Sequence, residues 1–163
     1  MKPPKKIAKK SNPKKVQPKS VVICSSAAFY KQVIEVRNQL KKMGFKVLVP
    51  LTAGKMERSG DFDVAKVKTW HVDAKAYKRK TFLTKHHFKK IVDGDVVLVL
   101  NYEKNGKPGY IGGAVLMEMG IALHFNKKIF ILNPIDESVG YKEEILGMQP
   151  VILEGNLDRM RVI

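Results

Sequence analysis

The sequence has a single cysteine and no long hydrophobic run, and these two shortages exclude several classes of protein. Cys24 has no partner within the chain, so an intramolecular disulfide is excluded, and sparse cysteine is typical of a reducing compartment. The longest purely aliphatic run, Val96 to Leu100, is far shorter than the roughly 20 residues that a membrane-spanning helix needs. The basic N-terminus also lacks the apolar region of a signal peptide. We therefore expect a cytoplasmic protein without a membrane span.

Acidic residues are missing from the first part of the chain. The formal net charge is +16, and residues 1 to 19 hold eight lysines and no acid, which leaves 23 basic against 15 acidic residues elsewhere. Lysine and proline with almost nothing apolar predict a disordered basic tail over residues 1–18. Such a tail either makes weak contacts with nucleic acid or another polyanion through counterion release, or serves only as a solubilising extension. No aromatic residue interleaves with its lysines.

Residues 19–163 have the length of one domain, and 44% of the whole chain is hydrophobic. Short apolar, largely β-branched runs predict strands at 20–24, 45–49, 95–100 and 128–132, and a weaker one at 151–153. Apolar residues at three- and four-residue spacing predict helices at 29–43, 82–93 and 112–126, with a short one at 142–146. This alternation predicts an α/β fold, a three-layer sandwich around a flavodoxin- or Rossmann-like parallel sheet of about five strands.

The segment from Thr52 to about Tyr77 is polar and has no clear periodicity. A long insertion of this kind after a strand is either a lid over the ligand site or a surface excursion. Its only tryptophan, Trp70, would pack on the core or on a bound base.

Ligands of doubly wound sheets bind at the carboxyl ends of the strands, where the strand order reverses. In a flavodoxin-like order, that point lies between the first and third strands. A helix that begins with glycines also offers free backbone N–H groups to an anion, although such glycines are common without a ligand. We therefore predict that the ligand-binding residues are Ser25, Ser26, Asn101, Tyr110, Gly112 and Gly113.

Glu118 interrupts an otherwise apolar stretch, AVLMEMGIAL at 114–123. A carboxylate in such surroundings is costly unless it is paired or functional. The alternative is that it faces solvent or caps a neighbouring loop. Its position about one and a half turns into the predicted helix places it within reach of the strand ends.

The segments MEMGIALHFNKKIFIL (117–132) and DGDVVLVLN (93–101) resemble the nucleoside 2-deoxyribosyltransferase family and its relatives, the deoxynucleoside 5′-monophosphate N-glycosidases. The resemblance extends over the order of elements from Ser20 to about Pro134, and it is greatest to a branch with YIGG (110–113) before the glutamate. In this family the helix glutamate attacks the anomeric carbon and forms a glycosyl-enzyme intermediate. The resemblance thus implies that Glu118 is a nucleophile, that the ligand is a nucleoside or nucleotide, and that the protein is a homo-oligomer. We expect no cofactor and no metal.

Two acids of the family are replaced in this chain. His87 stands eight residues before Asp95, where active members commonly have an aspartate, and Gly112 stands six residues before Glu118. An imidazole can donate or accept a proton near neutral pH, so His87 is our candidate for proton transfer to the leaving base, with His86 as the alternative. Either histidine could instead be an ordinary surface residue.

The leading hypothesis is an enzyme that acts on the N-glycosidic bond of a nucleoside or nucleotide and either transfers the (deoxy)ribosyl group to another base or hydrolyses the bond. One alternative is a catalytically inactive module that binds or senses a nucleotide. The other is a protein associated with RNA or another polyanion through its basic tail.

Overall fold

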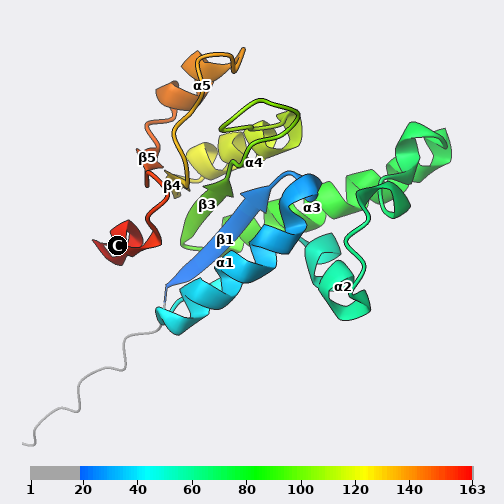
Figure 1. Ribbon diagram of the computed structural model, residues 1–163, viewed down its shortest axis with the longest axis horizontal. Helices are drawn as coiled ribbons and strands as arrows, with labels where there is room; N and C mark the ends of the chain where they lie inside the picture. The colour runs from blue at the N-terminus through cyan, green and yellow to red at the C-terminus, as the bar shows by residue number, and fades with distance from the viewer. Residues whose placement is uncertain (1–18, 163) are drawn as a thin grey trace, which may run out of the picture.

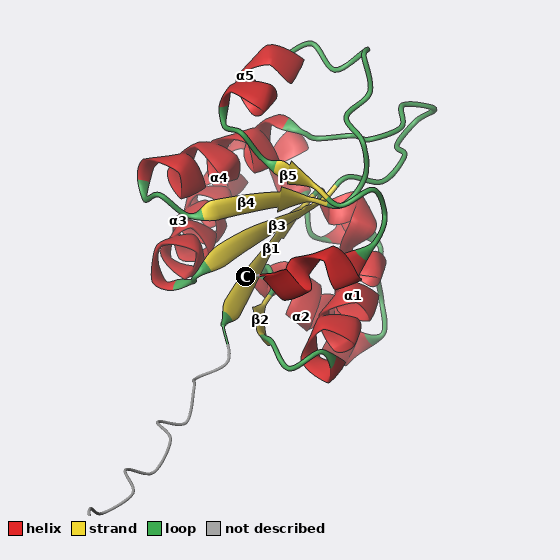
Figure 2. Ribbon diagram, turned by 90° about the vertical axis from the view of Figure 1, so that its left-hand side faces the viewer, coloured by secondary structure: helices red, strands yellow, loops and turns green. Residues whose placement is uncertain are grey.

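The structure is a computed structural model that describes residues 19–162, so the predicted tail lies outside the described residues. Within them, five parallel strands form one sheet in the order β2-β1-β3-β4-β5. The strands are β1 (Ser20–Ser25), β2 (Lys46–Leu48), β3 (Val96–Leu100), β4 (Lys128–Ile131) and β5 (Val151–Ile152). The α/β prediction is confirmed, and the strand order is that of a flavodoxin-like sheet. The order reverses at β1, which pairs with both β2 and β3 (Figure 2).

Helices cover both faces of the sheet and make the outer layers of the sandwich (Figure 1). They are α1 (Tyr30–Lys42), α2 (Leu51–Ser59), α3 (Tyr77–Asp93), α4 (Gly113–His124) and α5 (Lys142–Gly147). Alternate residues of β1 point to opposite faces, as a strand requires. Val21 and Ile23 pack in one cluster with α1, whereas Val22 and Cys24 pack in a second cluster with α3, α4 and α5.

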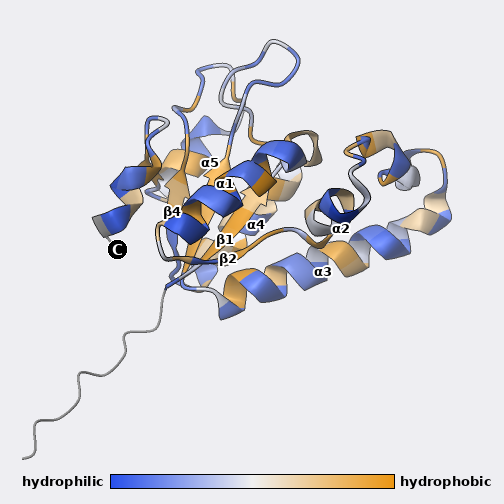
Figure 3. Cartoon of the chain, turned by 60° about the horizontal axis from the view of Figure 1, so that its bottom comes forward, coloured by the Kyte–Doolittle hydropathy of each residue, from blue (hydrophilic) through white to orange (hydrophobic). Residues whose placement is uncertain are grey.

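Hydrophobic side chains concentrate in the sheet and on the helix faces that cover it, and the outer faces of α1 and α3 are polar (Figure 3). Every residue of β1 and β3 is buried, because helices lie on both sides of these central strands. None of the helices in residues 19–162 has the length and apolar character that crossing a membrane requires.

The segment after Pro50 is more ordered than its sequence indicates. It opens with α2, for which Pro50 is the N-cap residue, and this helix ends at Gly60 in the left-handed conformation. Three short 3₁₀ turns follow between Val64 and Ala76, and α3 begins at Tyr77 rather than at Phe82. Only Thr52, Ala53 and Met56 of α2 are buried, and so narrow an apolar face gives little periodic signal.

Candidate functional site

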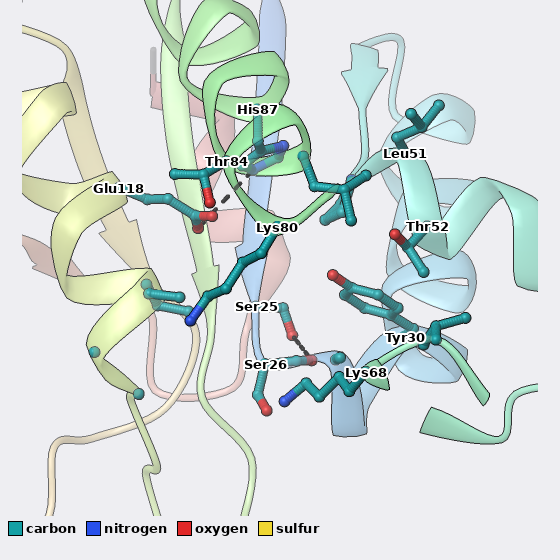
Figure 4. Close-up of a pocket in the computed structure, with 18 of the residues that line it drawn as sticks. Ser25, Ser26, Tyr30, Leu51, Thr52, Lys68, Lys80, Thr84, His87 and Glu118 are labelled. Atoms are coloured by element: carbon teal, nitrogen blue, oxygen red, sulfur yellow. Dashed lines mark hydrogen bonds and ion pairs between the residues drawn. The ribbon is translucent and has the colours of Figure 1, made fainter. Parts of the chain in front are cut away.

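A cavity of about 250 Å³ lies at the carboxyl end of β1, where the strand order reverses (Figure 4). Its walls come from the loop after β1, the N-terminal ends of α1, α2 and α4, the middle of α3 and the turns between α2 and α3. This is the position at which doubly wound sheets bind ligands. Of the predicted site residues, the structure brings together Ser25, Ser26, His87, Tyr110, Gly112, Gly113 and Glu118 in the lining of this cavity.

Glu118 and His87 form the floor of the cavity, with Cys24 behind them. Oε2 of Glu118 lies 3.9 Å from Nε2 of His87, and the two side chains are only 14% and 5% exposed. The same Nε2 lies 3.5 Å from Sγ of Cys24, which is fully buried at the end of β1. Among the described residues, Oε2 of Glu118 has no hydrogen-bond partner. The histidine is therefore buried beside the carboxyl group rather than on the surface.

Burial shifts the pKa of each floor group toward its uncharged form. It raises the pKa of Glu118 to about 8, and the nearby Cys24 thiol opposes this rise. Burial also lowers the pKa of His87 to about 4, assisted by the charges of Lys90 and His86. Burial raises the pKa of the Cys24 thiol well above its usual value. Near neutral pH the floor is thus a protonated carboxyl, a neutral imidazole and a thiol.

Three lysines from separate segments line the cavity: Lys68, Lys80 and Lys104. None of them pairs with a carboxylate in the part of the chain that the structure describes. Burial lowers the pKa of Lys68, and the charges of Lys104 and Lys80 lower it further. Positive charges gathered beside an uncharged floor favour an anionic ligand.

Aromatic rings lie close to two of these lysines. Nζ of Lys80 lies 5.8 Å from the centre of the Trp70 ring, and Nζ of Lys104 lies 4.6 Å from the centre of the Tyr110 ring. Trp70 lines the cavity, so the segment that carries it forms part of the site wall. Tyr30 contributes its hydroxyl from the start of α1 (Figure 4), and burial together with the nearby Glu118 raises the pKa of this phenol.

The N-terminus of α4 opens on the cavity through its two glycines. Gly112 is the N-cap residue, and no side chain caps the helix. A Cβ atom added at Gly113 would meet nothing within 4 Å, whereas one at Gly112 would lie 3.1 Å from the Tyr110 hydroxyl. Gly113 therefore leaves open space in front of backbone N–H groups that can bind an anion.

Asn101, predicted to bind the ligand, does not line this cavity. It is fully buried after β3. Its Nδ2 donates to the carbonyl oxygen of Asn133 at 2.9 Å, and its Oδ1 accepts from the backbone N–H of Asn133 at 2.8 Å. The side chain thus ties the end of β3 to the end of β4, and its hydrogen-bonding groups are occupied.

Several cavity residues had no distinctive signal in the sequence. The three lysines belong to a chain with 31 basic residues, so nothing marks them as inward-facing. The position of Cys24 beside the site could have been predicted, because strand alternation places its side chain on the same face as Val22, toward α3 and α4.

Two solved structures align with most of the chain. The chain aligns with the CMP N-glycosidase of Clostridium botulinum over 88% of its own length and 98% of the other chain, at a TM-score of 0.50 and 16% identity. It aligns with a 2-deoxyribosyltransferase of Bacillus psychrosaccharolyticus over 76% of its length and 78% of that chain, at a TM-score of 0.49 and 16% identity. No protein-family model and no curated protein matches the sequence. The likeness to the glycosidase shows a shared fold.

Proposed function

We propose that this protein cleaves the N-glycosidic bond of a nucleoside or nucleotide and passes the sugar to water or to another base, with Glu118 as the nucleophile. One observation carries the proposal: Glu118 is a buried carboxyl with an unpartnered oxygen at the floor of a cavity at the switch point of the sheet. A carboxyl group in such a place costs stability, which is the usual sign of a functional group.

The chemistry proceeds in two steps. A carboxylate oxygen of Glu118 attacks the anomeric carbon, a C–O bond forms, and the C–N bond to the base breaks with its electron pair passing to the base nitrogen. Water or an acceptor base then attacks the same carbon and loses a proton, the C–O bond to Glu118 breaks with its electron pair returning to the carboxylate, and the proton restores the resting carboxyl of Glu118. Transfer and hydrolysis differ only in which of these two molecules attacks.

One proton is transferred twice in the first step. The carboxyl of Glu118 must lose its proton before it attacks, and the departing base must gain one. Nε2 of His87, at 3.9 Å, is the nearest side-chain nitrogen to Oε2 of Glu118 among the described residues that line the cavity. We assign to His87 both the acceptance of this proton and its delivery to the base.

The rest of the cavity suits the other parts of such a substrate. Trp70 offers a ring on which a base can stack. The three lysines and the N-terminus of α4 offer positive charge and N–H groups to a phosphate.

One alternative has a specific observation in its favour. The family acids are replaced by His87 and Gly112, and burial holds Glu118 in its protonated, non-nucleophilic form at neutral pH. A cavity with these properties could bind a nucleotide without reacting with it. The alternative is thus a nucleotide-binding or sensing module.

The test is a panel of nucleosides and 5′-nucleotides incubated with the protein, with and without an acceptor base, and analysed by chromatography for free base. The proposal predicts base release by the wild type and by the control Glu144→Gln, whose glutamate is exposed on α5. Glu118→Gln should release base at least a thousandfold more slowly. Undiminished release by Glu118→Gln would exclude the nucleophile, and saturable binding without release would favour the sensing module.

A further inference from the structure

We propose that the floor of the cavity is a binding site for a soft divalent cation, zinc being the best chemical match, held by Cys24, His87 and Glu118. These residues come from three rigid elements, β1, α3 and α4. Sγ, Nε2 and a carboxylate oxygen of the three side chains lie within 4.8 Å of one another.

The separations are close to those of a tetrahedral site. Zinc bonds of about 2.0 to 2.3 Å place neighbouring ligand atoms roughly 3.3 to 3.8 Å apart. The distance from Sγ of Cys24 to Nε2 of His87 is 3.5 Å, and that from the same Nε2 to Oε2 of Glu118 is 3.9 Å. Small side-chain rotations would therefore close the site around an ion without movement of the backbone.

The ligand types select the ion. Thiolate and imidazole favour zinc and its softer neighbours, whereas magnesium and calcium require a shell of oxygen atoms. Oε2 of Glu118 has a free lone pair, because no hydrogen-bond partner reaches it in the described part of the chain. Thiolate and carboxylate together would balance the two positive charges of the ion, which limits its repulsion by the cavity lysines.

The site would be open on one side. His87 and Glu118 line the cavity, whereas Cys24 lies behind them in the strand. Three protein ligands leave a fourth tetrahedral position, and it would face the cavity, where water or an anionic ligand could take it.

Metal binding at this site would regulate the protein, a consequence that rests on the proposed function, although the binding itself does not. A cation on Glu118 occupies the lone pair that must attack the anomeric carbon, and a cation on His87 occupies the nitrogen that must carry the proton. Zinc and glycosidic chemistry would then exclude each other, and zinc would inhibit the protein reversibly.

The test uses the full chain after treatment with a chelator, titrated with Co²⁺ as a spectroscopic probe. Cys24 is the only cysteine, so a thiolate-to-cobalt charge-transfer band in the near ultraviolet can arise only at this residue. We expect one Co²⁺ per chain with this band, and its displacement by one equivalent of Zn²⁺. Cys24→Ser should lose the band, and His87→Gln should weaken Co²⁺ binding at least tenfold. His124→Gln, a change at an exposed histidine of α4 outside the cluster, should leave the affinity within about twofold.

Two results would overturn the proposal: no charge-transfer band in the wild type, or equal Co²⁺ affinity in the wild type and His87→Gln. The two variants act on different elements, so a folding defect in one, visible by circular dichroism, leaves the other as a test. The base-release assay, carried out with chelator present, judges the proposed function separately. Metal binding without base release would uphold this site and remove only its regulatory role.

Discussion

Replacement of Glu118 by glutamine should make the protein more stable while it abolishes turnover. The carboxyl has a pKa of about 8 in the folded protein against its ordinary value of 4.5. Near pH 7 the folded protein therefore keeps a proton on Glu118 that the unfolded chain releases. At about 1.4 kcal/mol per pKa unit, this proton costs roughly 3 kcal/mol of folding free energy at pH 7. Glutamine is neutral in both states and avoids the cost. Since the neutral carboxyl already leaves Oε2 unpartnered, we expect a net gain of about 1 to 3 kcal/mol.

The pH dependence identifies the source of the gain. A raised carboxyl pKa means that the folded protein binds the extra proton, so unfolding free energy falls as pH rises from about 4.5 to about 8. The lowered pKa of His87, about 4 against 6.5, works in the opposite direction, but the wild type and Glu118→Gln both carry His87, so its effect cancels in their comparison. Between pH 6.5 and 8 the wild type should therefore lose about 1.5 to 2 kcal/mol relative to Glu118→Gln.

The measurement is urea unfolding of chelator-treated protein at half-unit pH steps, with Glu144→Gln as the exposed control. The control should follow the wild type at every pH. If Glu118→Gln is less stable than the wild type at pH 7, or if its stability falls in parallel with that of the wild type up to pH 8, the carboxyl is not held protonated by burial and our account of the floor is wrong.

Three further predictions concern the rest of the chain. Gly113→Val should weaken nucleotide binding at least tenfold with little loss of stability, because the valine side chain would fill open space at the cavity that the ligand needs. The control is Gly120→Val, on the same helix and also in open space, and equal losses of binding and stability at Gly113 would contradict this prediction. Lys80→Met should weaken binding of a 5′-nucleotide by about 10- to 100-fold, the value of a charged hydrogen bond, and that of the nucleoside far less, whereas the exposed Lys41→Met should change neither. Deletion of residues 1–18, which hold seven lysines, should lower retention on heparin or RNA at low salt and leave unfolding free energy and nucleotide affinity unchanged; loss of folding would refute this.

The fold could be predicted because its signals are local. Continuous apolar runs mark β1 and β3, which are buried on both faces, and the 3.6-residue period marks α1. The helix α2 was missed because so few of its residues are buried. Its identity depends on packing against α1 rather than on a pattern in its own residues.

The location of the cavity could be predicted from the sequence, because it depends on the sheet topology alone. Parallel strands place their carboxyl ends at one edge, which brings Ser25 and the start of α4 together. The same rule does not tell which way a side chain turns, and the side chain of Asn101 turns to Asn133, outside the cavity. The approach of Cys24 to Glu118 follows no sequence spacing, because it depends on how α4 packs against β1.

Whether Glu118 is the nucleophile is tested most directly by mass spectrometry of the wild type after incubation with a 2-fluoro-substituted nucleoside or nucleotide, which slows release of a glycosyl-enzyme intermediate. Our account predicts a mass increase equal to one fluorinated sugar unit, located by proteolysis and fragmentation on Glu118 and absent from Glu118→Gln. Turnover of the unsubstituted substrate together with an unmodified Glu118, or a sugar adduct on another residue, would contradict the account.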